Sequence, residues 1–302
     1  MSIRLSLLIF LAAAIALARG GQVNWSCAFN SNNLKSTGAP MDGQMTFELG
    51  VFTGGFVPAA ANVSSWAANW RRASLAFYNP RLRHFTGVHP VTSNATPFAV
   101  GTKGYIWGHD GNCTNGEWIL LSAPSWTWPT QNPVELPVNW TVSSASQAVV
   151  GQANGSGIHM QTAKVSASLP QTSWAEWRAK VFDSAQLLDP AVSGLKADPD
   201  LDGQVNLSEF ALGGHPLIAG GTHDRVIPGL VMEGGRQRLT MTVSKRCDRT
   251  ALWSAQVSTD LSHWLPGGMV TLQETSDFLI VREDLTTTGS SRVFLRPLFQ
   301  LP

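Results

Sequence analysis

Residues 238–244 read Arg238-Leu239-Thr240-Met241-Thr242-Val243-Ser244. Apolar and hydroxyl-bearing side chains alternate strictly from the second residue of this run to the last. Because successive side chains of a strand point to opposite faces, a period of two predicts a strand with one face buried and the other in water. Antiparallel sheets commonly have that arrangement. The run therefore predicts a small antiparallel β domain in the last part of the chain.

Further runs on both sides share this alternation, or are rich in β-branched and aromatic residues between Gly, Asn or Pro. They are residues 44–52, 104–107, 118–121, 140–143, 252–257, 278–281 and 293–298. Turn-forming residues recur between them, which is typical of short strands joined by turns. We therefore expect a mainly β chain with two antiparallel β domains.

A helix is expected within residues 62–78. Trp66, Trp70, Ala73 and Phe77 recur there at steps of three and four, which is the period of a helix with one buried face. We expect the tryptophans to face the core.

A second helix is expected to begin at Ser173. Ser173 and Glu176 form a capping box, in which the hydroxyl and the carboxylate satisfy free backbone donors at a helix start. This helix falls between the two β regions. We expect an N-terminal β domain over residues 19–169, a helical segment with an acidic loop over residues 170–216, and a C-terminal β-sandwich-like domain over residues 217–302.

The first 18 residues have the features of a secretory signal peptide. Arg4 precedes an apolar run over residues 5–17, and the small residues Ala16 and Ala18 flank the position of cleavage. We expect cleavage after Ala18, a mature chain that begins at Arg19, and export to the periplasm, the cell surface or the medium. No later stretch is apolar enough over about 20 residues to predict a transmembrane segment.

Composition limits the partners. Charged residues make up 14% of the chain and the net charge is +1, so the sequence offers no basic stripe for phosphates, and nucleic acid is not an expected partner. The three cysteines are Cys27, Cys113 and Cys247. An exported protein can form disulfides, so either Cys27 pairs with Cys113 within one domain, or all three are buried thiols.

The acidic loop matches a calcium-binding pattern at each diagnostic position of its 12 residues. The expected ligands are the side chains of Asp198, Asp200 and Asp202 at positions one, three and five, the backbone carbonyl of Gln204 at seven, Asn206 through water at nine, and Glu209 with two oxygens at twelve. Gly203 stands at position six, where the loop turns sharply. The sequence therefore predicts one EF-hand-like calcium site.

The donor set and its setting point to a structural calcium ion. Four carboxylates around one point repel unless a cation lies among them. Mg²⁺ requires a tighter octahedron, and Zn²⁺ prefers His or Cys, which the loop lacks. Pro190, Gly194 and Pro199 leave no continuous helix before the loop, and no partner hand follows. A calcium sensor's switch is therefore not expected, and we expect the ion to stiffen an interdomain joint.

Residues 198–212, the loop and the short helix expected after it, resemble the loop-helix calcium repeat of dockerins and the Asp-rich repeats of thrombospondin type 3 modules. Dockerins carry two such repeats, whereas this sequence carries one.

A longer resemblance is to exported proteins of verrucomicrobial and planctomycetal bacteria, in which a loop ending in Glu-Tyr-Ala-Leu-Gly precedes a terminal β region with Ser-x-Asp-Leu-x-x-Trp. The matching motifs here are Glu209-Phe210-Ala211-Leu212-Gly213, Ser258-Thr259-Asp260-Leu261-Ser262-His263-Trp264 and Arg292-Val293-Phe294-Leu295-Arg296. In the N-terminal part, residues 47–52, 55–58 and 105–108 are similar to the same group. The resemblance implies an exported protein with one calcium loop and a C-terminal β region.

The sequence predicts no catalytic residue. Ser193 and Lys196 have the spacing of a serine acyl-transfer motif without its companion motifs, and chance explains them better. His109-Asp110 and His223-Asp224 lie in glycine-rich stretches, and we expect solvated turn residues at both.

Three functions stay open. The first is a non-catalytic exported module whose partner is a protein or the cell envelope. The second is a carbohydrate-binding protein, in which Trp126 and Trp128, two residues apart on one strand face, would stack on sugars if exposed. The abundance of tryptophan favours burial of that pair. The third is a hydrolase with an unrecognised site.

Overall fold

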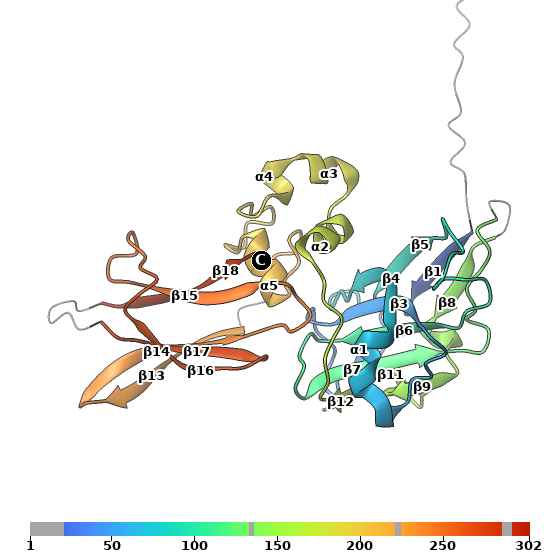
Figure 1. Cartoon of the computed structure of the whole chain (residues 1–302), viewed down its shortest axis with the longest axis horizontal. Coiled ribbons are helices and arrows are strands. Elements are labelled where there is room, and N and C mark those ends of the chain that lie inside the picture. The colour runs from blue at the N-terminus through green and yellow to red at the C-terminus, as the bar shows by residue number, and fades with distance from the viewer. Residues whose placement is uncertain (1–20, 133–135, 221–224, 286–291) are drawn as a thin grey trace, which may run out of the picture.

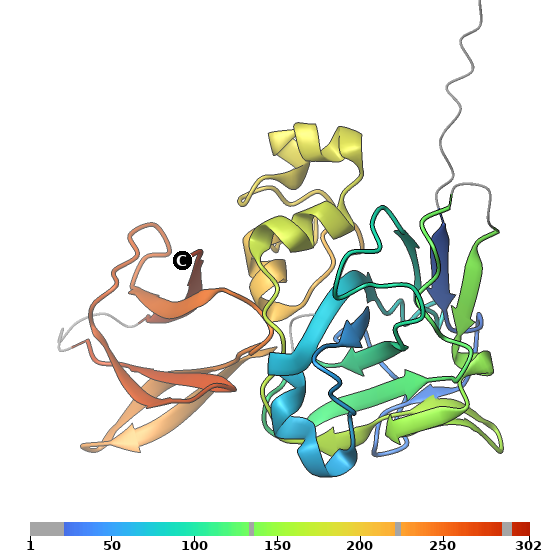
Figure 2. The same cartoon turned by 45° about the vertical axis from the view of Figure 1, so that its right-hand side comes forward.

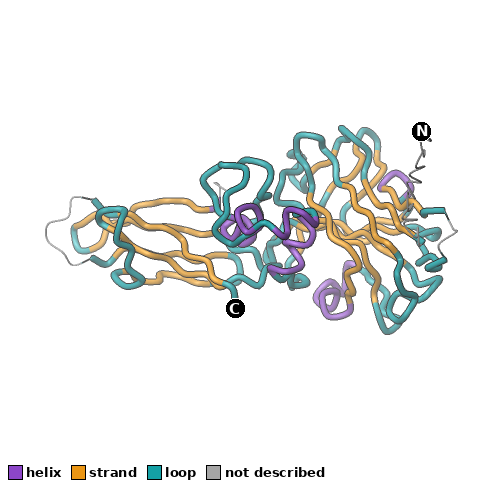
Figure 3. The backbone as a smooth tube through the Cα atoms, turned by 90° about the horizontal axis from the view of Figure 1, so that it is seen from above, coloured by secondary structure: helices purple, strands orange, loops and turns teal. Residues whose placement is uncertain are grey.

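The computed structural model describes residues 21–132, 136–220, 225–285 and 292–302. The predicted signal peptide, with its cleavage position after Ala18, lies outside these residues. The chain is mainly β, as the sequence predicts, and its two strand-rich regions lie at opposite ends with the helices α2 to α5 (residues 174–212) between them (Figures 1 and 3). In the described part of the chain, no helix has the length and apolar character needed to cross a membrane.

The N-terminal region is built on a six-stranded sheet. Its strands run in the order β12 (Ala163–Val165), β7 (Gly116–Ser122), β6 (Gly104–His109), β3 (Thr46–Phe52) and β4 (Trp70–Phe77), with β9 (Gln147–Val150) also paired to β7. β3, β6 and β7 are buried at every position. Both faces of the sheet are therefore covered, which is why these strands read as nearly continuous apolar runs.

Each face of this sheet carries its own apolar cluster. Phe47, Leu49 and Ile106 on one face pack with Trp25 and Trp140. These two tryptophans come from a second sheet, ordered β5 (Thr86–Pro90), β1 (Gln22–Ser26) and β8 (Val138–Thr141). A third small sheet pairs β10 (Gln152–Gly155), β11 (Ile158–Gln161) and β2 (Asn33–Leu34). A short 3-10 helix, η2 (Val142–Ser144), follows β8.

Two strand pairs in this region are parallel, β1 with β8 and β2 with β11. The predicted antiparallel β architecture is thus joined by two parallel pairs that the sequence analysis did not predict. Alternation along one strand reports which face is buried and carries no information on the direction of its neighbour.

The helix predicted over residues 62–78 is mostly wrong. A 3-10 helix η1 (Ala60–Ser65) and a single turn α1 (Trp66–Asn69) are followed by the strand β4. Trp66 and Trp70 are buried, as predicted, on the other face of the large sheet. The indole of Trp70 lies over Gly50 of the neighbouring strand, where an added Cβ would come within 2.6 Å of the ring. The pairing of β4 with β3 therefore makes this segment a strand, although its apolar residues have helical spacing.

The C-terminal region has a four-stranded sheet facing a two-stranded one. The larger sheet is ordered β13 (Val226–Glu233), β14 (Arg236–Ser244), β17 (Phe278–Glu283) and β16 (Met269–Glu274), and the smaller pairs β15 (Leu252–Ser258) with β18 (Phe294–Gln300). On β14, Met241 and Val243 are buried and Leu239 is half-buried, which confirms the alternation. Gly234 and Gly235 both have positive φ in the β13–β14 turn, which favours glycine there.

The helical segment lies between the two β regions (Figure 2) and shares an apolar core with the C-terminal sheets. It contains α2 (Trp174–Val181), α3 (Ser184–Leu188), α4 (Pro190–Ser193) and α5 (Asn206–Leu212). The predicted capping box of α2 is confirmed, because Ser173 Oγ accepts from Glu176 N. Pro190 begins α4, since a first helical position needs no N–H. Trp177 and Phe210 share one apolar core with Met241.

The residues after β14, 245–250, join the two β regions through buried charges. Asp248 Oδ1 and Oδ2 accept from Arg246 Nε at 2.9 Å and Nη2 at 2.8 Å, and Oδ2 accepts from Arg249 Nη1 at 2.6 Å. All three side chains are almost fully buried. Arg246 Nη1 also donates to the backbone carbonyl of Gln44 at 2.8 Å, in the N-terminal region. An added Cβ on Gly111 would lie 2.4 Å from the Arg246 guanidinium, so glycine is needed for this approach.

A second set of charges adjoins this cluster. Glu48 Oε1 accepts from Arg72 Nη1 at 2.8 Å and lies 3.4 Å from His109 Nε2. Burial alone would raise the pKa of Glu48, but Arg72 and His109 outweigh it and hold that pKa below its ordinary value. His109 and Asp110 are buried, so the prediction of solvated turn residues is wrong here. Residues 245–250 from the far end of the chain cover this turn.

The disulfide joins Cys113 to Cys247, and Cys27 is a buried free thiol. The predicted pairing of Cys27 with Cys113 is therefore wrong. Cys27 lies in the apolar core of the N-terminal region, whereas Cys113 lies in the turn after β6 that faces residues 245–250. Burial, the largest influence, raises the pKa of the Cys27 thiol to about 11, so this group stays protonated at neutral pH.

We predict that Asp248→Ala destabilises the fold by about 3–5 kcal/mol, because it leaves two buried arginines without their carboxylate. Chemical denaturation of the oxidised protein measures this loss. Asp284→Ala removes a half-exposed carboxylate outside residues 245–250 whose partners, Arg238 and Arg282, keep Glu283 and Glu233; it is the matched control and should cost less than about 1 kcal/mol. Equal losses in the two variants would contradict a central role for the cluster.

Candidate metal centre

The acidic loop begins five residues after the end of α4 and ends in the first turn of α5. Aspartate side chains of the loop accept hydrogen bonds from backbone N–H groups of the same loop. Asp198 Oδ2 accepts from Gly203 N at 3.0 Å, and Asp202 Oδ1 accepts from Gln204 N at 2.8 Å. Gly203 has φ of 89°, a left-handed conformation that glycine adopts without strain, as its place at position six requires.

Three carboxylates of the loop converge. Asp198, Asp200 and Asp202 each offer an oxygen, and these oxygens lie within 4.8 Å of one another. Asp198 Oδ1 and Asp200 Oδ2 are buried and have no hydrogen-bond partner within the described chain. The structure thus brings together the first three predicted ligands, with part of their bonding capacity unused.

Glu209, the predicted ligand at position twelve, is 1% exposed. Its Oε2 has no hydrogen-bond partner among the described residues. Burial, and then the charges of Asp200, Asp202 and Asp198, raise the pKa of Glu209 to about 8. Glu209 is therefore close enough to the three aspartates for their charges to oppose its ionised form, although its oxygens are not among those that lie within 4.8 Å of one another.

Asn206 has a structural role besides its predicted one. Its side chain is fully buried, and Nδ2 donates to the backbone carbonyls of Val192 and Gly194, each at 2.8 Å. This ties the loop to the end of α4. Asn206 Oδ1 has no partner in the described part of the chain, which leaves one acceptor for a water molecule at position nine.

The predicted carbonyl ligand, Gln204, lies in the loop between Gly203 and α5. Taken together, the oxygen donors come from carboxylates and from a backbone carbonyl, a hard set that suits Ca²⁺. The loop contains no His or Cys for a softer metal. The residues present therefore fit the ion that the sequence pattern predicts.

The contact between the loop and the residues that follow α5 was not predicted. Gly220 N donates to Asp202 Oδ2 at 2.8 Å, and Gly213 N and Gly214 N donate to the backbone carbonyl of Glu209 at 2.7 and 2.8 Å. Residues 213–220, the glycine-rich segment, are thus attached to two predicted ligand residues. The only sequence signal for this contact is the glycine content, which also fits an ordinary turn.

The other motifs do not form a catalytic site among the described residues. Ser193 is buried, and its Oγ accepts from Arg178 Nη2 at 2.7 Å, whereas Lys196 is exposed. His223 and Asp224 lie outside the described residues.

The tryptophans are largely inside the protein. Trp126 and Trp128 are each 1% exposed, which confirms the prediction of burial. Nine of the twelve tryptophans are buried and the other three, Trp174, Trp253 and Trp264, are half-buried. Since a sugar-stacking platform needs an exposed ring face, the carbohydrate hypothesis loses the residues on which it was based.

Comparisons with models of protein families, with curated proteins and with solved structures found no match.

We predict that the calcium-free protein loses stability as pH rises from about 4.5 towards 8, because an acid whose pKa is raised by folding favours the folded state only while protonated. At about pH 7 the cost from Glu209 is up to about 3 kcal/mol. Glu209→Gln, which keeps the size and removes the charge, should be more stable than the unsubstituted chain near pH 7 and equal to it near pH 4. Thermal melting in chelator, with Glu274→Gln as control, checks both. A Glu209→Gln variant less stable near pH 7 would contradict the repulsion.

Proposed function

We propose that this chain is an exported, non-catalytic protein that binds one Ca²⁺ through Asp198, Asp200, Asp202, Gln204, Asn206 and Glu209. The ion fixes the loop between α4 and α5, within the helical segment that joins the two β regions. The partner of the protein is another protein or the cell envelope.

The observation that carries this proposal is the position of Glu209. A carboxylate that is 1% exposed, has an oxygen without a hydrogen-bond partner among the described residues and feels the charges of three aspartates is unfavourable without a cation. Such a group persists in a fold when a bound ion compensates its charge. The spacing of the ligands over 12 residues supports the same ion.

The surroundings of the loop support a structural role. Asn206, at position nine, anchors the loop to the end of α4, and the helix that carries Glu209 packs Phe210 and Leu212 into the core shared with the C-terminal strands. No second loop of this kind is present in the sequence, so the paired opening of a calcium sensor has no counterpart here. If the dissociation constant is that of an extracellular module, ~10⁻⁴ M, then ~2 mM calcium stabilises the fold by about 1.8 kcal/mol.

We predict that the protein binds one Ca²⁺ per chain and that Asp198→Ala or Glu209→Gln lowers the affinity by at least about tenfold, since each removes a charged ligand. Calorimetry on metal-stripped protein measures the stoichiometry and the affinity. Asp277→Asn, a carboxylate outside the loop, is the control and should bind like the unsubstituted chain. Unchanged affinity in the Asp198→Ala, Glu209→Gln double variant would refute the site.

We also predict that chelation exposes the Lys196 peptide bond to trypsin. The Lys196 side chain is already exposed, but its neighbours are held by backbone bonds from Leu207 N to Leu195 O at 3.1 Å and from Asn206 N to Ala197 O at 2.8 Å. Cleavage therefore requires local opening, which a bound ion opposes.

Limited proteolysis with calcium and with chelator, followed by mass spectrometry, tests this. Arg236 at the start of β14 is an internal control, since it is exposed and lies in another part of the fold. Cleavage after Arg236 should not change. If cleavage after Lys196 is equal in both conditions while calorimetry shows the loop loaded and emptied, the structural role of calcium is wrong.

A further inference from the structure

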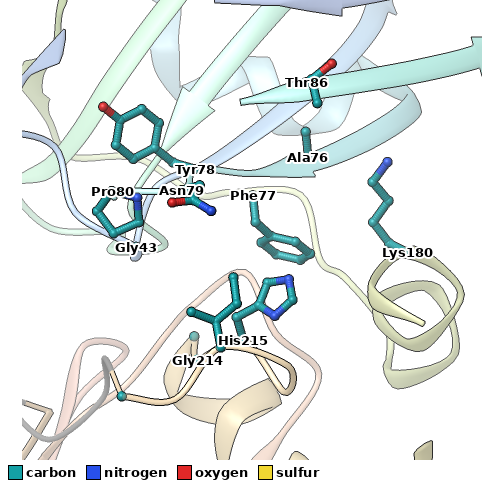
Figure 4. A pocket seen from close by; sticks show the side chains of 13 residues that line it. Gly43, Ala76, Phe77, Tyr78, Asn79, Pro80, Thr86, Lys180, Gly214 and His215 are labelled. Atoms are coloured by element: carbon teal, nitrogen blue, oxygen red, sulfur yellow. The ribbon is translucent and has the colours of Figure 1, made fainter. Parts of the chain in front are cut away.

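A pocket of about 390 Å³ lies between the N-terminal sheet and the glycine-rich segment 213–220 (Figure 4). The end of β4 and the turn after it form one wall, the glycine-rich segment forms the opposite wall, and α2 closes a side with Lys180. None of the metal ligands proposed above lines it.

The body of the pocket is apolar. Phe77 and Pro80 line it from the N-terminal region, and Ile218 lines it from the glycine-rich segment. The rings of Phe77 and His215 meet across it edge to face, with their centroids 6.1 Å apart. These groups favour an apolar portion of a ligand about the size of one ring or a short aliphatic chain.

Two neutral groups present hydrogen-bond donors at this surface. His215 Nδ1 accepts from Leu217 N at 3.2 Å, so in the neutral ring the proton is on Nε2, which is a donor. Burial lowers the pKa of His215 and favours that neutral form. Asn79 Oδ1 accepts from the backbone N–H groups of Arg81 and Leu82, each at 3.0 Å, which leaves the two N–H bonds of Asn79 Nδ2 as donors.

Lys180 adds a positive charge. It is half-buried in the last turn of α2, and among the described residues it has no ion pair. Burial lowers its pKa, and no carboxylate of the described residues lies within ion-pair distance to offset the cost of the charge. None of the lining residues is an aspartate or a glutamate. The pocket therefore combines one cation and several donors with no acidic group.

We propose that this pocket binds a small molecule with a carboxylate head and an apolar body, with the carboxylate at Lys180 and the body against Phe77, Pro80 and Ile218. An uncompensated ammonium beside an apolar cavity favours an anion there over water or a cation. The cavity volume admits a molecule the size of phenylacetate or hexanoate.

The second part of this inference rests on the calcium site proposed above. The pocket wall is held by the bonds from Gly213 and Gly214 to Glu209 O and from Gly220 to Asp202 Oδ2. An ion that orders the loop therefore also orders this wall, and the two ligands should strengthen each other's binding.

The test uses the mature, oxidised protein in calcium and measures binding of phenylacetate and hexanoate by calorimetry, against their neutral amides as matched ligands. We expect each carboxylate to bind at least about tenfold tighter than its amide. Lys180→Met should remove this preference, and Lys180→Arg should retain it. Equal binding of acid and amide, no binding of either, or an unchanged preference in Lys180→Met would overturn the proposal.

A blocking variant locates the site. An added Cβ on Gly43 would have its nearest neighbour, Pro80 Cδ, at 3.9 Å, so Gly43→Leu fits the backbone and places its side chain at the pocket. It should melt like the unsubstituted protein and bind neither acid nor amide. Carboxylate binding at full strength in Gly43→Leu would place it elsewhere and refute the pocket.

The same titration in chelator separates the two proposals. Carboxylate affinity should fall when calcium is removed. If the chain binds no calcium, the proposed function fails, and the comparison of acid with amide still tests whether the pocket binds carboxylates. If calcium binds and the carboxylate affinity is the same with and without it, the coupling is refuted. The comparison of acid with amide then tests the pocket independently of calcium.

Discussion

The buried carboxylate of Asp248 is the group on which the placement of the two β regions depends. It accepts hydrogen bonds from Arg246 and Arg249, and Arg246 also donates to the backbone carbonyl of Gln44 in the N-terminal region. Either arginine left alone at this depth would be strongly unfavourable, so the residues hold their position as a set. Gly111 leaves room for the guanidinium, and the bond from Cys113 to Cys247 fixes the same approach covalently.

This junction also positions the helical segment. Thr172 N donates to Asp248 O at 2.8 Å, and Thr250 N donates to Thr172 O at 3.3 Å, so the residue before the α2 cap is attached to the junction. On the opposite side, an added Cβ on Gly213 would lie 2.6 Å from Arg246 Nη1. The start of α2 and the end of α5 therefore both lie against one charge cluster. Lys180 and the glycine-rich segment face each other across the pocket as a consequence.

Local signals in the sequence predict local structure well here. The alternation over residues 238–244, the capping box at Ser173 and the ligand spacing from Asp198 each depend on neighbours in the chain, and the structure has the corresponding strand, helix and carboxylate cluster. The errors arise where a segment distant in the sequence determines the local conformation or burial. Trp70 lies over Gly50 and belongs to a strand, and the turn at His109 is buried by residues 245–250, more than 130 positions later. No spacing rule within a short window contains that information.

The short helix α5 shows how packing and charge oppose each other at the candidate metal centre. Four consecutive residues from Glu209 to Leu212 are buried, although one face of a single helix turn accommodates fewer. Phe210 and Leu212 gain from the apolar core, and their burial draws Glu209 out of water and towards the three aspartates. The position of α5 therefore stabilises the apolar core and at the same time disfavours the ionised form of Glu209. A divalent cation bound by the aspartates would reduce this conflict, because its charge offsets the repulsion that the packing of α5 imposes on Glu209.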